Sequence, residues 1–340
     1  MRNDHQFVIE LVRPGGDVET VPLTPDWEPA LEWTRLTGLC AHDVWAPEAD
    51  AERQVEPVWN AELGEPFVSG FRVHLAPRNR AAWSADFPSS YFADEARAAA
   101  ARLVESGALE AGDRVVYRTM AFARSEPATV AVDVRFEIAD ARPPLPLRRT
   151  RLDDFLASSI VRGRASADDP EVLLSQSILD EATALTADAG ASETGGVLIG
   201  HLHRDPDRRR IFVEVTAQIP ARHTTSDSVK LTFTSETWTD ARSAIALRGG
   251  DEQMLGYWHS HPAIEWCKRC APEQQRACHV ATGFLSADDR ALHRVMFPRA
   301  YTVALVMTHT LDGIMPALFG WREGVLAPRG FRLVERASLD

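Results

Sequence analysis

The chain has 340 residues, a formal net charge of −12 at pH 7, 45% hydrophobic residues and 25% charged residues. These values are typical of a globular protein, and the length allows two domains with separate cores. No apolar run approaches the roughly 20 residues of a membrane-spanning helix, and the N-terminal residues lack the apolar stretch of a secretory signal. We therefore expect a cytoplasmic protein with no membrane partner, whose four cysteines are free thiols or metal ligands.

The charge is unevenly distributed along the chain. Residues 1–147 hold 24 acidic and 14 basic residues, a balance of −10, whereas residues 148–340 hold 25 acidic and 23 basic residues, a balance of −2. Neither part has the basic stripe that binds phosphates, so we expect no nucleic-acid partner. The acidic first part either faces a basic protein surface or only keeps its own surface solvated.

Residues 1–140 predict a separate α+β domain. Alternating apolar residues, turn residues and an alanine-rich stretch ended by a glycine predict, in chain order, a hairpin of strands at 7–12 and 18–23, a helix at 27–36, a strand at 71–75, a helix at 92–106, and strands at 114–122 and 129–138. Three prolines in four positions then disfavour both helix and central strand, so residues 141–150 are interpreted as a Pro-rich linker.

Residues 151–340 predict an α/β domain with a mixed sheet and flanking helices. An apolar stripe predicts a helix over Leu173–Ala189, ended by Gly190. Further helices are predicted at 235–248 and 287–295, and strands at 195–202, 211–219, 230–233, 254–258, 301–307, 317–321 and 331–334.

Two histidines end one of these strands, in the sequence Gly256-Tyr-Trp-His-Ser-His-Pro262. Side chains at i and i+2 of a strand share a face, so His259 and His261 present two imidazoles together while Ser260 points away. Pro262 then ends the strand, which predicts that the pair lies at a sheet edge open to a cleft. Two imidazoles with a carboxylate form a catalytic zinc set. His201-Leu-His203 shares the spacing but is interpreted as ordinary strand residues.

Two further fragments supply candidate partners. Ser286-Ala-Asp-Asp289 precedes an apolar helical run and predicts a capping box, which would also hold Asp289 rigidly enough to be a metal ligand. Glu193 precedes two glycines and a buried-looking strand. It is either an exposed carboxylate in a connection or a functional acid, and the glycines permit close approach by a neighbour or a substrate.

Taken in order, Glu193, His259-Ser-His261-Pro and Ser286-x-x-Asp289 resemble the motif of the JAMM family of metallopeptidases, also called JAB or MPN-plus. The resemblance covers about residues 170–335. It implies a JAMM/MPN-like fold for residues 151–340, with zinc bound by His259, His261 and Asp289. It further implies that Glu193 is the general base for the attacking water and that Ser286 stabilises the oxyanion.

The resemblance also implies an isopeptidase that cleaves after the C-terminal glycine of a ubiquitin-like protein, in deconjugation or precursor processing. Its partners would be that modifier, its conjugates, and E1-like and E2-like proteins encoded nearby. The Arg- and Ala-rich composition, with two lysines, is typical of a high-GC bacterium, and the resemblance then implies a bacterial deconjugase of antiviral defence. The alternatives are a peptidase that trims sulfur-carrier proteins and a catalytically silent MPN scaffold. Residues 1–140 would then recognise the modifier.

One insertion departs from the family pattern. The 24 residues between His261 and Ser286 exceed the usual gap and include a Cys-rich stretch, residues 263–283. Cys-x-x-Cys is a common half of a zinc knuckle, so we favour a second, structural zinc. Its candidate ligands are Cys267, Cys270, Cys278 and His279, although adjacent residues such as the last two rarely share one ion. A redox-active thiol pair and plain free cysteines are the alternatives.

Overall fold

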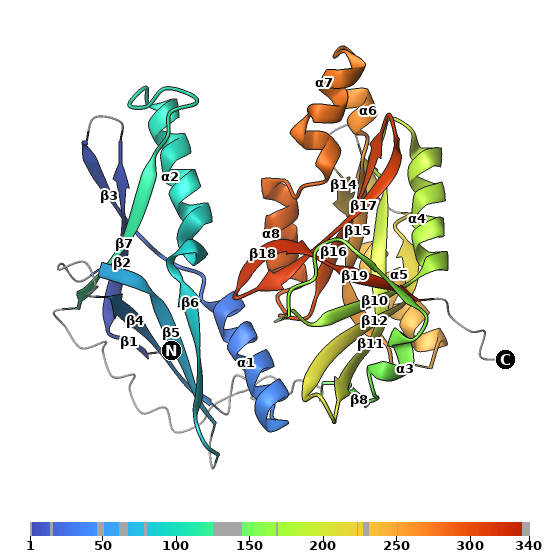
Figure 1. Ribbon diagram of the computed structural model, residues 1–340, viewed down its shortest axis with the longest axis horizontal. Helices are drawn as coiled ribbons and strands as arrows, with labels where there is room; N and C mark the ends of the chain where they lie inside the picture. The colour runs from blue at the N-terminus through green and yellow to red at the C-terminus, as the bar shows by residue number, and fades with distance from the viewer. Residues whose placement is uncertain are drawn as a thin grey trace. The chain divides into compact units, whose positions relative to one another are not determined.

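A computed structural model describes residues 2–334 except 14–15, 46–50, 61–66, 78–79, 125–144, 168, 223, 227–230 and 250. The chain divides into two compact units (Figure 1). The first unit comprises Met1–Leu39, Val44–Pro143 and Glu323–Val325, and the second comprises Cys40–Asp43, Pro144–Arg322 and Leu326–Asp340.

The first unit is built on a seven-stranded sheet, in the order β1-β4-β5-β7-β2-β3 with β6 paired to β5. Its elements are β1 (Arg2–Asn3), β2 (His5–Val12), β3 (Val18–Pro22), α1 (Glu28–His42), β4 (Ala51–Asn60), β5 (Phe67–Pro77), β6 (Trp83–Pro88), η2 (Ser89–Phe92), α2 (Ala93–Glu105) and β7 (Val116–Ala123). Alternate residues of β2 and β5, such as Phe7 and Phe71, are buried and pack with rings that include Trp27 and Phe92.

The predicted hairpin, both predicted helices and the strands around residues 71–75 and 114–122 are confirmed in this unit. The strands β4 and β6 were not predicted. The predicted strand at 129–138 lies outside the described residues, as do residues 141–144 of the predicted linker. Later in that segment, β8 (Arg148–Arg149) pairs in parallel with residues 203–204.

The second unit is built on a ten-stranded mixed sheet, in the order β18-β17-β16-β15-β11-β12-β10-β19-β9 with β8 paired to β11. The remaining strands are β9 (Ser159–Arg162), β10 (Glu171–Ser175), β11 (Gly195–Asp205), β12 (Arg210–Pro220), β15 (Gln253–His261), β16 (Val303–Thr310), β17 (Gly313–Arg322), β18 (Val325–Arg329) and β19 (Phe331–Val334), with a separate pair β13 (Thr224–Ser226) and β14 (Leu231–Phe233). This confirms a mixed α/β fold. The interior strands β11, β15 and β16 are almost entirely buried.

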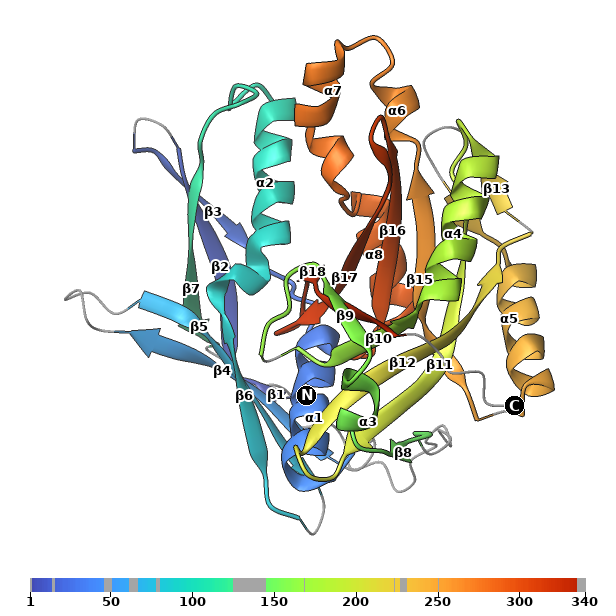
Figure 2. The same ribbon diagram turned by 45° about the vertical axis from the view of Figure 1, so that its right-hand side comes forward.

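Helices lie beside both faces of this sheet (Figure 2). They are α3 (Asp153–Leu156), α4 (Gln176–Ala189), α5 (Ser235–Leu247), α6 (Ala263–Trp266), α7 (Pro272–Ala277) and α8 (Ala287–Met296), with the short η3 (His279–Thr282). On one face of the sheet, Val197 and Ile199 pack with Ala241 of α5. On the opposite face, Trp258 Nε1 donates a hydrogen bond to Gln218, and the Gln218 amide donates one to Glu181 of α4. No helix in the described part of the chain is long and apolar enough to span a membrane.

The predicted helix over Leu173–Ala189 is wrong at its start. Residues 171–175 form β10, which lies in parallel between β12 and β19, and the helix begins at Gln176. Leu173 and Leu174 are both buried although they point to opposite faces. A strand buried on both faces reads as a continuous apolar run, which periodicity does not distinguish from a buried helical turn.

Candidate metal centre

The strand β15 positions both histidines of the motif. His259 and His261 lie at its carboxyl end, on one face, and each is 2% exposed. The strand lies inside the sheet, antiparallel to β11 and parallel to β16. Gly256 permits this close pairing, because a Cβ there would lie 1.8 Å from the carbonyl oxygen of Val303. The prediction of a sheet edge is therefore wrong: the pair stands at the end of an interior strand.

The start of α8 positions the carboxylate. Ser286 is the N-cap, and its Oγ accepts a hydrogen bond from the Asp289 backbone N–H at 3.1 Å. In return, the Ser286 backbone N–H donates to Asp289 Oδ2 at 2.8 Å, which confirms the predicted capping box. The Tyr257 hydroxyl also donates to the Asp289 carbonyl oxygen at 3.1 Å. The Asp289 side chain is thus fixed relative to β15.

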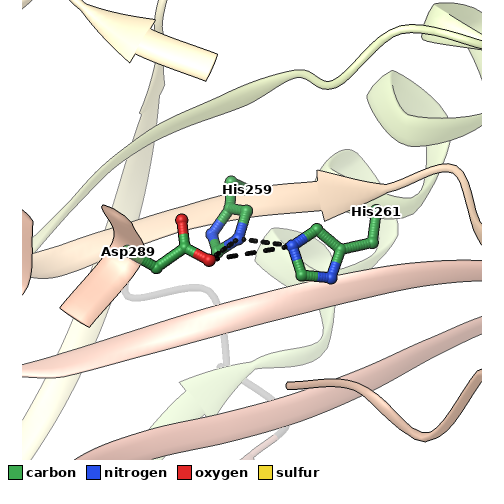
Figure 3. A group of neighbouring side chains, drawn as sticks. All are labelled: His259, His261 and Asp289. Carbon is green, nitrogen blue, oxygen red and sulfur yellow. Dashed lines mark hydrogen bonds and ion pairs between the residues drawn. The ribbon is translucent and has the colours of Figure 1, made fainter. Parts of the chain in front are cut away.

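The three side chains converge on one point (Figure 3). The two Nε2 atoms of His259 and His261 lie 3.0 Å apart, and Asp289 Oδ2 lies 3.4 and 3.9 Å from them, respectively. This is the one group of three His, Cys, Asp or Glu ligand atoms within 4.8 Å of one another in the described ranges. Tetrahedral zinc ligands at about 2.1 Å from the ion stand about 3.4 Å apart, so the spacing suits such an ion.

The charge states also suit a divalent cation. Burial lowers the pKa of His261 to about 3, with a further decrease from His259 and an opposing increase from Asp289. Burial alone would raise the pKa of Asp289, but His259 and the hydrogen bonds from Ser286 hold it below its usual value. A neutral imidazole of His261 and an ionised carboxylate therefore face the same point at neutral pH. Two imidazoles and a carboxylate are donors that zinc accepts in proteins.

Glu193 lies two residues before β11, next to the end of β15 that carries the histidines. The ladder between β11 and β15 begins with the pair Gly195 and His259. The Thr194 N–H donates to Ser260 Oγ at 2.9 Å, and the Ser260 N–H donates to the Thr194 carbonyl at 2.8 Å. Extending this register by one residue would bring Glu193 level with His261, and residues directly opposite one another share a face.

Glu193 is 7% exposed, so its alternative interpretation as an exposed carboxylate is wrong. It lies outside the group of ligand atoms that meet within 4.8 Å. The neighbouring Gly196 serves the chain's own packing, because a Cβ there would lie 2.5 Å from the Ile219 carbonyl oxygen and 2.6 Å from Trp258 Nε1. The glycines after Glu193 were expected to allow close approach by a neighbouring segment or by a substrate. For Gly196, neighbouring strands make that close approach.

Aromatic rings enclose the histidines, and the sequence did not predict them. Trp266 and Phe284 lie against His261, with ring centroids 5.1 and 4.7 Å away, and Tyr257 stacks on His259 at 5.6 Å. Trp266 follows His261 by five residues, and this short separation is the only signal that the sequence offers. The rings of Trp266 and Phe284 contribute to the burial that lowers the pKa of His261.

The candidate ligands of a second zinc lie near one another without forming such a group. The Cys267 side chain is buried and lies close to those of Cys278 and Cys270. Among Cys267, Cys270, Cys278 and His279, however, no three ligand atoms lie within 4.8 Å of one another. The second metal site remains a prediction.

Comparisons with known proteins give a family match for part of the chain. Residues 175–265 match the model of prokaryotic homologs of the JAB domain, a segment that includes Glu193, His259 and His261 but ends before Ser286 and Asp289. No curated protein matches the chain. The solution structure of protein DSY2949 from Desulfitobacterium hafniense is 19% identical, with a TM-score of 0.33, covering 49% of this chain and 95% of that one. The family match supports a relationship with the JAB/MPN family, which includes metallopeptidases.

Proposed function

We propose that this chain is a zinc-dependent peptidase of the JAMM type that cleaves after the C-terminal glycine of a ubiquitin-like protein. Cleavage would release the modifier from a conjugate or process its precursor. The observation that carries the proposal is the convergence of His259 Nε2, His261 Nε2 and Asp289 Oδ2 on one point. Glu193, which is buried beside the start of the β11–β15 ladder, adds the acid that such a reaction needs.

Each residue has a defined task. His259, His261 and Asp289 would hold the zinc, which supplies a positive charge that polarises the scissile carbonyl and makes a water more acidic. The Glu193 carboxylate takes a proton from the attacking water and delivers it to the leaving amine. Ser286 Oγ already accepts the Asp289 N–H, so its own hydrogen is directed elsewhere and can donate to the developing oxyanion.

The burial of the donor atoms favours a slender substrate. Both histidines are 2% exposed, and the Asp289 side chain is 18% exposed, so little of the donor set is open to solvent. A glycine-rich tail has no side chains to exclude and can extend beside a strand end. This favours the tail of a ubiquitin-like protein over a bulky peptide.

The acidic residues 1–147 supply a second element of the proposal. A cleft that holds a few residues of tail buries little surface, so specificity needs contact with the modifier's globular body. We assign that contact to the first unit, whose sequence segment has a balance of −10. The protein would then act together with E1-like and E2-like partners in bacterial antiviral defence.

The deciding experiment replaces the general base. Glu193→Gln should lower kcat for cleavage of ubiquitin-like fusions by at least about 10²-fold, because the neutral amide of glutamine cannot accept the proton of the attacking water. Its zinc content and melting temperature should stay at wild-type values. The substrates are fusions in which a ubiquitin-like protein precedes a reporter.

Glu273→Gln is the matched control, because Glu273 is exposed on α7 and has no assigned role. It should cleave at the wild-type rate. Near wild-type turnover by Glu193→Gln would remove Glu193 from the reaction. Bound zinc without any cleavage by the wild-type chain would instead favour the scaffold alternative.

A further inference from the structure

Three thiols lie together in the insertion that follows the histidine motif. Cys267 directly follows α6 and is buried, Cys278 is half-buried and Cys270 is exposed. The Cys267 side chain interacts with both of the others. The backbone N–H of Cys270 donates to the Cys267 carbonyl at 2.8 Å, so Cys-x-x-Cys forms a tight turn. Such a turn is the geometry in which two thiolates reach one metal.

The insertion has almost no core of its own. None of residues 268–282 is buried, and α6, α7 and η3 contain four, six and four residues. Beneath it lies a cavity of about 150 Å³, lined by residues of these helices and of the β16–β17 turn. A protein interior is normally close-packed, so hydrophobic burial contributes little here. Segments this small are commonly held by a metal or by disulfides.

We propose that Cys267, Cys270 and Cys278 together bind one soft divalent cation, with zinc the expected ion, and that this ion fastens the insertion to the end of the sheet. Each thiol would release its proton to solvent on binding. Zinc thiolates at about 2.3 Å from the ion stand about 3.8 Å apart. Cys270 therefore has to turn towards Cys278, which its exposed position allows.

A redox pair fits the same thiols less well. A disulfide would join two of the thiols and leave the third unused, whereas one cation accommodates all three. His279 directly follows Cys278, and its ring lies 6.2 Å from that of Phe284. The three cysteines are therefore the protein ligands, and solvent takes the fourth position.

The site would also steady the candidate catalytic centre. Trp266 immediately precedes Cys267, and its ring lies against His261. On the far side of the insertion, Arg276 of α7 bonds to Asp312 in the β16–β17 turn at 3.1 Å. A cation on Cys267 would thus fix the segment between two points of attachment. The binding of the cation does not depend on the proposed peptidase activity.

Metal analysis of the full chain is the first test. The wild type should hold two zinc ions, and Cys267→Ser/Cys270→Ser and Cys278→Ser should each hold one and melt at a lower temperature. Cys40→Ser, which changes a half-buried cysteine outside the insertion, should keep both ions. His261→Ala should lose the other ion, so failure of the catalytic site and failure of this site are distinguishable. Unchanged zinc content in both cysteine variants would overturn the proposal.

Cobalt spectroscopy covers the case in which a cysteine variant does not fold. Co²⁺ added to the metal-free wild-type chain should give thiolate-to-cobalt charge-transfer absorption, which the His259, His261 and Asp289 set has no sulfur to produce. The absorption should persist in His261→Ala and in Cys40→Ser. Its absence in the wild type would reject the site. A protein mass that is lower by two hydrogens under mild oxidation, with no cobalt band after reduction, would establish the redox pair instead.

Discussion

Two His-x-His pairs lie on neighbouring strands of one sheet, and only one of them forms a candidate metal centre. His201 and His203 lie on β11, whereas His259 and His261 lie on β15, and all four are nearly fully buried. The rings of the first pair are 6.0 Å apart and those of the second pair are 4.7 Å apart. The two pairs therefore share their sequence spacing and their burial, so neither of these properties explains why the second pair lies closer together.

The acids distinguish the pairs. His203 Nε2 lies 3.0 Å from Glu214 Oε2, and His201 Nε2 lies 4.0 Å from Glu252 Oε1, so each ring faces its own carboxylate. His259 and His261 instead share Asp289, which a capped helix end holds between them. Separate acids stabilise separate imidazoles, whereas a shared acid makes a third donor for one ion. The prediction that His201 and His203 are ordinary strand residues agrees with this geometry.

The largest expected difference between the pairs is in metal content. His261→Ala should lower bound zinc by one ion per chain, because two remaining protein donors bind zinc weakly. His203→Ala should lose stability but keep its zinc. Metal analysis of both purified variants measures the contrast. Equal zinc content in the two variants would erase the distinction between the pairs.

Much of this site could be predicted from the sequence because its residues are local. His259 and His261 are one strand repeat apart, and Ser286 and Asp289 are one capping box. The enclosure of the site could not be predicted in the same way. Trp266 and Phe284 come from an insertion whose path depends on tertiary contacts, and nothing periodic in its sequence fixes where their rings lie.

The same distinction between local and tertiary determinants applies to the secondary structure. Strands with one buried face, such as β2, and capped helices, such as α8, have a local pattern and were predicted. By contrast, β4 carries charged residues and Pro57, features that argue against a strand, yet it pairs along its length with β5. Pairing with a neighbour overrode local preference there.

A third kind of buried imidazole provides a reference for both pairs. His293 is surrounded by Tyr257, Phe297 and Trp321, and burial lowers its pKa to about 3. An unfolded histidine has a pKa of about 6.5, so between these values the unfolded state binds more protons. The free energy of unfolding should therefore fall as the pH falls through this window, by up to about 1.4 kcal/mol per pH unit.

His293→Phe keeps an aromatic ring in that position and removes the titrating group. Urea unfolding of this variant should show a smaller loss of stability than the wild type between neutral pH and about pH 4. A wild-type slope in the variant would show that other groups, such as His201, whose pKa burial also lowers, dominate the acid response.

The shared acid should depend on its helix cap. Ser286→Ala removes the acceptor for the Asp289 N–H and should lower the free energy of unfolding by about 1 kcal/mol. Cleavage should slow as well, while Ser286→Thr retains both properties. Chemical denaturation of Ser286→Ala and Ser286→Thr measures the difference, and an unchanged free energy of unfolding in Ser286→Ala would contradict it.

The smallest expected effect is the coupling free energy between one histidine and its acid. It distinguishes the two His-x-His pairs most clearly, because it is measured separately for each pair. A double-mutant cycle of His203→Phe and Glu214→Gln should give a coupling of about 1 kcal/mol, typical of a buried hydrogen bond. Phenylalanine preserves the stacking on Phe212, whose ring is 4.6 Å away, so the cycle isolates the polar contact. This coupling should be the same with and without a chelator. The cycle of His261→Phe and Asp289→Asn should instead change when zinc is removed, because both residues act through the ion. A His203–Glu214 coupling that vanished on chelation would place that pair in a metal site too.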